Sequence, residues 1–167
     1  YPGLERTAIV SDADDAIQMA KSYGTHIIRC ARPGLNEALA EGRLALVNSG
    51  ATSMIILPVD LPFACVQDLI EISSLGDRYP VVIAPDKAGT GTNALFLDSK
   101  VSLKFQFGSN SFRLHQLESI RCGRQPYLFI NERISLDIDE PGDLLLLERS
   151  APSVDCSSSF CSYRRSA

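Results

Sequence analysis

The stretch Met-Ile-Ile-Leu-Pro-Val-Asp-Leu-Pro, residues 54–62, decides the fold of this chain. Its first four residues form an unbroken apolar run, which is typical of a strand buried on both faces of a parallel sheet. Pro58 and Pro62 lack a backbone N–H group and restrict φ, so they end the strand in a stiff, extended turn around Asp60. Open α/β sheets bind ligands at the carboxyl ends of central strands, so Asp60 is a candidate functional residue. The alternative is that Asp60 caps the helix that follows.

The composition predicts one soluble domain with a substantial core. The chain has 167 residues, of which 45% are hydrophobic, and its mean hydropathy is close to zero. No apolar run approaches the roughly 20 residues that cross a bilayer, and no signal-peptide pattern is visible, so we expect a cytoplasmic protein that does not bind membranes. Acidic and basic residues are mixed, with a net charge of −4, which argues against a nucleic-acid partner. The five cysteines form no C-x-x-C pair, which favours reduced thiols over a zinc site. A homodimer is left open.

The apolar pattern predicts alternating strands and helices, and therefore an α/β domain over residues 1–149. Strands are predicted over residues 7–10, 26–29, 54–57, 81–84, 94–97, 127–130 and 135–139. Helices are predicted over 14–23, from Leu35 onward, over 63–75, over 111–123, and from 141 to 149. The Ser-rich residues 150–167 lack periodicity and are expected to form a disordered tail. No Gly-rich or basic loop accompanies the first strand, so an opening strand–loop–helix unit of a doubly wound domain is expected to be absent.

Two loops carry glycine beside hydroxyl residues. In the first, Gly89 to Thr92 could present successive N–H groups and hydroxyls to an anion, and the alternative is a plain turn. In the second, Gly108 leads through Ser109 into Ser111 at a predicted helix start, where backbone N–H groups favour an anion. The alternative there is simple Ser or Asn capping.

Two further polar features are less specific. Gly34 and Asn36 precede a predicted helix; they could contact a purine base, or they could cap the helix. His115 lies near Arg113, and we interpret it as a surface or interface histidine rather than a metal ligand.

Carboxylates occur at two predicted strand ends. Asp137 and Asp139 share one face of the strand predicted at 135–139, because residues i and i+2 point the same way. If they converge with Asp60, the three charges repel one another unless a cation joins them, and Mg²⁺ is the economical choice. With anion-holding loops nearby, the pattern indicates nucleotidyl transfer, in which a phosphate oxygen attacks the α-phosphorus of a nucleoside triphosphate. No Ser/His/Asp or Cys/His arrangement is apparent.

Four motifs together resemble the 2-phospho-L-lactate guanylyltransferase family, which includes phosphoenolpyruvate guanylyltransferases of coenzyme F-420 biosynthesis. These motifs are Leu-Pro-Val-Asp-Leu-Pro (57–62), Ile-Ala-Pro-Asp-Lys-x-Gly-Thr-Gly-Thr-Asn-Ala-Leu (83–95), Phe-Gly-x-x-Ser-Phe (107–112) and Leu-Asp-Ile-Asp-x-Pro-x-Asp-Leu (136–144). The resemblance spans residues 3–149. It implies a three-layer α/β sandwich with a mostly parallel central sheet, of the nucleotide-diphospho-sugar transferase type.

The resemblance also implies roles for individual residues. Asp60 and one of the pair Asp137 and Asp139 would hold Mg²⁺, with Asp60 as the catalytic residue. The residues expected beside the phosphorylated three-carbon acid are Thr92, Gly108 and Ser111, together with Gly91 and Asn93. Those expected beside GTP are Gly34, Asn36 and Pro58.

The resemblance leaves alternatives, because the family's opening strand, Lys-containing loop and helix have no match here. One alternative is another nucleotidyltransferase of the same fold, such as a molybdopterin guanylyltransferase or a cytidylyltransferase. The other is a non-catalytic remnant that binds the acceptor but not the nucleotide.

Overall fold

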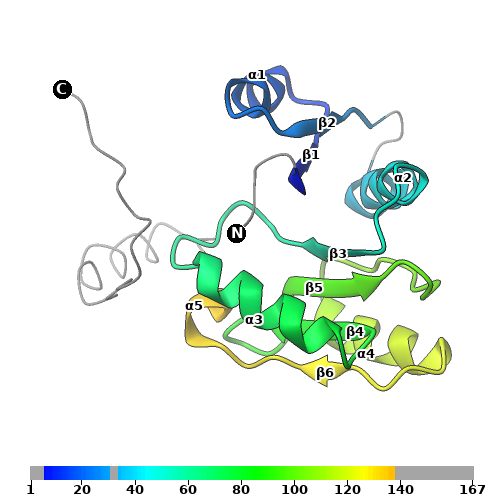
Figure 1. Cartoon of the computed structure of the whole chain (residues 1–167). Helices are drawn as coiled ribbons and strands as arrows, with labels where there is room; N and C mark the ends of the chain where they lie inside the picture. Colours follow the sequence, from blue (N-terminus) through cyan, green and yellow to red (C-terminus); the bar gives the residue numbers. More distant parts are fainter. Residues whose placement is uncertain (1–5, 31–33, 138–167) are drawn as a thin grey trace, which may run out of the picture.

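A computed structural model describes residues 6–30 and 34–137, in which strands and helices alternate except at the consecutive strands β4 and β5 (Figure 1). The strands are β1 (Ala8–Val10), β2 (His26–Ile28), β3 (Ser53–Ile56), β4 (Val81–Pro85), β5 (Thr92–Asp98) and β6 (Tyr127–Leu128). The helices are α1 (Asp14–Ser22), α2 (Leu35–Asn48), α3 (Val66–Gly76), α4 (Ser111–Arg121) and α5 (Glu132–Ser135). None of these helices is long and apolar enough to cross a membrane.

The strands form a parallel pair, β1–β2, and a four-stranded sheet in the order β3-β5-β4-β6. β5 runs antiparallel to both of its neighbours, while β4 and β6 are parallel, so β3, β4 and β6 share one direction. The reversal of β5 has a local cause: the connection from Pro85 to Thr92 is short, and only antiparallel neighbours can be joined by a short hairpin. The predicted α/β sheet is therefore confirmed, with one reversed strand.

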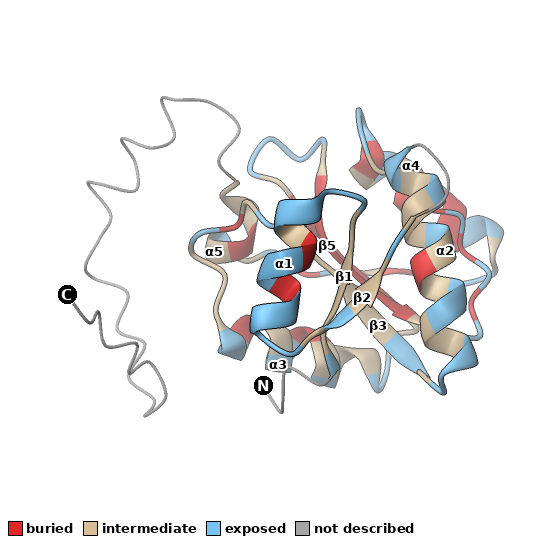
Figure 2. Ribbon diagram, turned by 90° about the horizontal axis from the view of Figure 1, so that it is seen from above, coloured by how far each residue is buried: buried red, intermediate tan, exposed pale blue. Residues whose placement is uncertain are grey.

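The four-stranded sheet carries a core on each face. Figure 2 shows the buried residues of its central strand β5 in red. Alternate residues of β4 and β5 point to opposite faces. Val82 and Phe96 pack with Ile72 of α3 and Ile134 of α5. On the other face, the core consists of Val81, Ile83, Leu95, Leu97, Val101, Leu103 and Phe105. We call residues 99–107 the strap; it lies with α4 on this second face. The result is a three-layer sandwich.

The strand of the opening motif differs from its prediction. Residues 54–56 of β3 are half-buried, because β3 lies at the edge of the described sheet and pairs with β5 alone. The prediction of burial on both faces is therefore wrong for β3, whereas β4 and all but the last residue of β5 are buried. An apolar run indicates a strand but does not say how many neighbours the strand has.

The strand predicted over residues 135–139 is also wrong in its described part. Ser135 ends the short helix α5, which Asn131 caps by accepting hydrogen bonds from the N–H groups of Arg133 and Ile134, at 2.9 and 3.1 Å. The cap competes with the apolar alternation and starts a helical turn. The helix predicted from residue 141 and the tail 150–167 lie outside the described residues.

Candidate functional site

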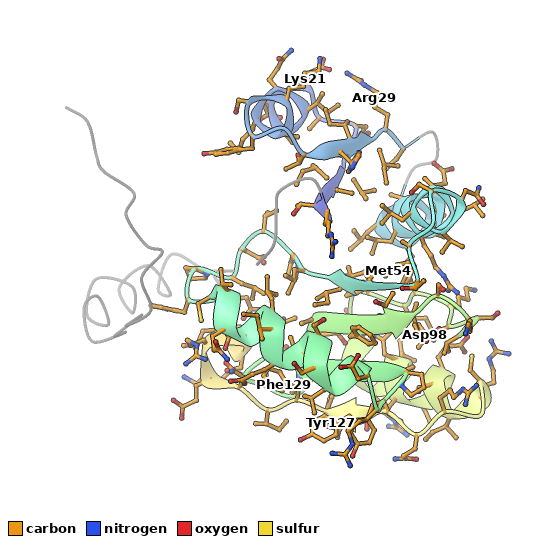
Figure 3. The ribbon with its side chains drawn as sticks, in the orientation of Figure 1. Lys21, Arg29, Met54, Asp98, Tyr127 and Phe129 are labelled. Atoms are coloured by element: carbon orange, nitrogen blue, oxygen red, sulfur yellow. The ribbon has the colours of Figure 1, made fainter. Side chains whose placement is uncertain are left out.

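Several chain segments meet where β3 and β4 end and β5 begins, that is, at one end of the strands of the four-stranded sheet. We call this end, with Asp60, Pro85 and Thr92, the site edge. Pro85, the last residue of β4, pairs with Thr92, the first residue of β5. β3 runs in the same direction as β4, so the turn that contains Asp60 leaves the sheet at this edge as well. The opposite edge is marked in Figure 3 by Met54 and Asp98, at the start of β3 and the end of β5. The edge with Asp60 and Thr92 is the one at which α/β sheets bind ligands.

Thr92 is joined to His115 of α4 in the core. The Thr92 hydroxyl oxygen lies 2.9 Å from His115 Nδ1, and the backbone N–H of Gln106 donates to His115 Nε2 at 3.0 Å. The two residues are 6% and 0% exposed. Burial lowers the pKa of His115 to about 4, against an opposing effect of Glu118, so the ring is neutral at pH 7. The interpretation of His115 as a surface or interface histidine is wrong, since the residue is fully buried and both of its ring nitrogens have partners inside the protein.

Ser111 is the first residue of α4 and is only 2% exposed. It precedes His115 by four residues, so both side chains lie on the same face of the helix, which is the face toward Thr92. The Ser111 hydroxyl makes no hydrogen bond within residues 6–30 and 34–137. In the described residues, Asp60 Oδ1 is the only fully enclosed side-chain polar atom without a partner, so the Ser111 hydroxyl reaches solvent and is accessible to a ligand.

The loop before α4 presents backbone donors to solvent. Gly108 has φ +117° and Asn110 has φ +59°, which are left-handed conformations that glycine and asparagine tolerate. The N–H groups of residues 108–110 have no partner in the described part of the chain. By contrast, the N–H groups of Ser111 and Phe112 donate to the carbonyls of Gly108 and Thr90, both at 3.0 Å. The candidate anion donors are therefore in the loop, and the first two N–H groups of the helix are occupied.

The Gly89–Thr92 loop does not present its N–H groups as predicted. The carboxylate of Asp86 accepts from the N–H groups of Thr90 and Gly91, at 2.8 and 2.7 Å, and from the Thr90 hydroxyl at 3.0 Å. Burial raises the pKa of Asp86, but these hydrogen bonds more than offset burial and hold the pKa below its ordinary value. Gly91 is needed because a Cβ there would lie 2.7 Å from an Asp86 oxygen. Asp86 is thus the anion that this loop binds, and Thr92 alone of the motif faces His115.

Asn36 fastens the strap to α2. Its amide nitrogen donates to the Phe107 carbonyl at 3.0 Å, and its amide oxygen accepts from the Phe107 N–H at 2.7 Å. The N-cap residue of α2 is Gly34, at φ +107°, so Asn36 does not cap the helix. The pair of bonds fixes the residue before Gly108, and a contact of Gly34 or Asn36 with a nucleotide stays a prediction.

Asp60 lies in the turn after β3, between the exposed Pro58 and the buried Leu61. Its Oδ1 is buried and has no hydrogen-bond partner among the described residues, which fits a carboxylate that holds a cation. No group of three or more His, Cys, Asp or Glu side chains suited to a metal occurs within residues 6–30 and 34–137. Asp139 lies outside these residues, so its pairing with Asp137 at a metal is not tested.

Asp68 is a charged residue that the sequence analysis missed. It is fully buried, and its carboxylate accepts from the Cys65 N–H and from Asn131 Nδ2, both at 2.9 Å. Arg133 Nε lies 3.1 Å from both carboxylate oxygens, and a second guanidinium nitrogen of Arg133 also donates to Asp68. Burial raises the pKa of Asp68, but the bonds from Arg133 and Cys65 outweigh it and lower the pKa overall. The sequence signal was Asp68 at the third position of α3, where it reaches back to the Cys65 N–H as in a capping box.

The Asn93 side chain binds α5 to the sheet. Its amide nitrogen donates to the Ile134 carbonyl at 3.0 Å, on the sheet face opposite to Thr92. The Lys87 N–H donates to the Ser135 carbonyl at 2.9 Å. These bonds hold the segment that leads to Asp137 against the site edge, whereas a contact of Asn93 with an acceptor stays a prediction.

Two hollows flank the strap. The smaller, about 310 Å³, is lined in part by Asn36, Gln106 and Ser109, next to the loop of residues 108–110. The larger, about 700 Å³, lies between α2 and the strap, and is lined in part by Arg43 and Leu103. The smaller hollow therefore lies between the start of α2 and the loop of residues 108–110, while the larger one lies further along α2.

Comparison with known proteins identifies the family. The family model described as guanylyl transferase CofC like matches residues 3–148. A phosphoenolpyruvate guanylyltransferase of Rubrobacter xylanophilus is 37% identical over 151 residues, which cover 89% of this chain and 73% of that protein. Another from Chloroflexus aurantiacus is 37% identical, covering 72% of this chain and 59% of that protein. A 2-phospho-L-lactate guanylyltransferase of Methanocaldococcus vulcanius is 29% identical, covering 83% and 62%.

A solved structure agrees on the fold. A protein of Desulfovibrio desulfuricans G20, assigned to the nucleotide-diphospho-sugar transferases, superposes with a TM-score of 0.70 at 15% identity, covering 99% of this chain and 73% of that one. The chain spans between 59% and 73% of the length of the three relatives described above. The fold is that of the nucleotide-diphospho-sugar transferases, and this chain belongs to the CofC-like guanylyl transferase family.

Proposed function

We propose that this chain transfers GMP from GTP to a phosphorylated three-carbon acid and releases pyrophosphate. The candidate acceptors are 2-phospho-L-lactate, phosphoenolpyruvate and 3-phosphoglycerate, and the product would serve coenzyme F-420 biosynthesis. The names of the relatives support this class of reaction, since they are phosphoenolpyruvate and 2-phospho-L-lactate guanylyltransferases. The two acids differ by few atoms, so the choice between them rests on experiment.

The observation that carries the proposal is the set of donors around the start of α4. The Ser111 hydroxyl and the N–H groups of residues 108–110 have no partners in the described part of the chain, and Thr92 lies on the same side of the sheet. A phosphate has the oxygens to accept all of these bonds, and hydrogen bonds to a charged group are the stronger kind. The acceptor's phosphate would therefore bind between β5 and α4.

The same edge offers a carboxylate for a divalent cation. Asp60 would hold Mg²⁺ together with one of Asp137 and Asp139, and the unpartnered Asp60 Oδ1 supports this role. When bound, the ion would neutralise negative charge that develops on the phosphate oxygens. The residues proposed for the nucleotide side are Gly34, Asn36 and Pro58.

The reaction needs no side-chain nucleophile. An oxygen of the acceptor's phosphate forms a bond to the α-phosphorus of GTP, and the bond from that phosphorus to the pyrophosphate oxygen breaks. The work of the chain is to orient the two phosphates and to reduce their repulsion. Donors such as Ser111 and the loop N–H groups suit this task, because they bind anions without reacting with them.

The test is a pyrophosphate-release assay with GTP, Mg²⁺ and each of the three acids in turn. Release with one acid and GTP supports the proposal. Release with CTP in place of GTP would instead identify another nucleotidyltransferase. Absence of release with every acid and nucleotide contradicts the proposal, and calorimetric titration with GTP and Mg²⁺ then shows whether the chain is an acceptor-binding remnant.

Two buried serines of α4 provide a matched pair of variants for the acceptor site. Ser111→Ala should weaken phosphoenolpyruvate binding roughly tenfold or more, because it removes a hydrogen bond to a charged group. Ser119→Ala is the control, because Ser119 lies about two helical turns beyond Ser111. It is 0% exposed, and its hydroxyl donates to the Arg124 carbonyl at 2.7 Å. Equal effects of the two variants on binding would contradict the placement of the phosphate at Ser111.

A further inference from the structure

The hydrogen bonds of His115 determine where its ring proton lies. His115 Nε2 accepts from the Gln106 N–H, so this nitrogen carries a lone pair and no proton. A neutral imidazole has one N–H group, which must then be at Nδ1. The partner of Nδ1 is the Thr92 hydroxyl oxygen, 2.9 Å away, which therefore accepts this bond.

This assignment leaves the Thr92 hydroxyl with a proton to donate. Thr92 makes no other side-chain hydrogen bond within the described ranges, although it is only 6% exposed. Without His115, the hydroxyl could rotate and act as a donor or as an acceptor. With Nδ1–H on one of its two lone pairs, the hydroxyl does not donate to His115 and keeps its proton for a third group.

We propose that His115 is a positioning residue that leaves the proton of the Thr92 hydroxyl free for donation to the acceptor's phosphate. This inference rests on the proposed function, because it concerns the same acceptor. His115 acts on a second part of the site too: through Gln106 it holds the strap, which continues into Gly108 and the loop with the unpaired N–H groups. One buried side chain thus couples the two segments that would contact the phosphate.

The first test needs no ligand. Nitrogen-15 NMR of the full chain at pH 7 distinguishes the two neutral tautomers of a histidine by the shifts of the ring nitrogens. We expect His115 to be protonated at Nδ1, whereas a free imidazole side chain favours Nε2. A proton at Nε2 of His115 would overturn the proposal, since the Thr92 hydroxyl would then be the donor to His115.

The second test measures phosphoenolpyruvate binding in the presence of Mg²⁺. His115→Gln can keep an acceptor for the Gln106 N–H but cannot place an N–H group at the position of Nδ1. We expect the dissociation constant to rise about tenfold, the effect of one hydrogen bond to a charged group. Ser119→Ala, a buried change on the same helix, should leave the constant unchanged.

A double-mutant cycle separates positioning from general stability. In a Thr92→Val background, His115→Gln should have no further effect on binding, because the hydroxyl that it orients is gone. If His115→Gln raises the dissociation constant by the same factor in the Thr92→Val background as in the parent, the proposal is overturned and His115 only packs in the core. If the parent chain binds none of the three acids, the proposed function fails, while the tautomer still decides which way the Thr92 hydroxyl donates.

Discussion

Asp68 offers the sharpest test of how the site edge is held together. Asp68→Asn keeps the size of the side chain but removes its charge and places an NH₂ group against a donor, either the Cys65 N–H or the Arg133 guanidinium. Asp68 is the link between the start of α3, which follows the Asp60 turn, and α5, which leads to Asp137. Loss of this link should therefore lower the stability of the whole edge.

The magnitude follows from burial. Removing one partner of a buried ion pair typically costs about 3–5 kcal/mol, because it leaves the other charge uncompensated. Asp68 is fully buried, but 37% of the Arg133 side chain is exposed, so water can solvate the freed guanidinium. We therefore expect a loss of about 2–4 kcal/mol in the free energy of unfolding at pH 7. For a chain of this size, that corresponds to a fall of roughly 5–15 °C in melting temperature.

Urea unfolding of the parent and the variant measures this loss, with Glu118→Gln as the matched control. Glu118 also pairs with an arginine on α4, but Arg121 is 66% exposed, and a glutamine can still accept from the Lys104 N–H, so the loss should be smaller than that of Asp68→Asn. Because the folded pKa of Asp68 is lowered, its contribution should be present above the unfolded pKa of about 4 and should be lost progressively as the pH falls from there toward the folded pKa. Equal losses in the two variants at pH 7, or a difference that does not shrink as the pH falls below about 4, would refute the reasoning.

Three further predictions concern other parts of the structure. Asp60→Asn should abolish Mg²⁺-dependent pyrophosphate release and leave the melting temperature within a few degrees, since Asp60 Oδ1 has no protein partner among the described residues to lose; near-parental turnover would show that Asp60 only shapes the turn. Gly76→Ala should destabilise the fold by about 1–3 kcal/mol, because a Cβ there would overlap the buried Phe96 ring, and adding Phe96→Leu should recover part of the loss in urea unfolding. Stability should fall by about 3 kcal/mol between pH 6.5 and pH 4, because the unfolded chain protonates His115 near 6.5 and the folded chain only near 4; unfolding curves of His115→Gln should lack this component.

The sequence by itself determined the class of fold and the kinds of residue at the site. Apolar runs followed by a proline and a nearby aspartate predicted β3 and β4 and their turns, and most predicted helices lie within a few residues of the observed ones. These features are local, since strand and helix patterns follow from neighbouring residues along the chain. The motifs at residues 57–62, 83–95 and 107–112 likewise predicted the family that the comparisons identify.

Only the tertiary structure decided which partner each polar group has. The Gly89–Gly91 loop looked ready for an external anion, but Asp86 already occupies its N–H groups. His115 was interpreted as a surface or interface residue, yet it lies in the core, where Thr92 of β5 and Gln106 of the strap, 23 and 9 residues away along the chain, supply a partner for each ring nitrogen. Hydrogen bonds between distant segments depend on how the layers pack, and no periodicity along the chain encodes them. The same packing leaves Ser111 and the loop of residues 108–110 without partners in the described chain, and it is there that we place the acceptor.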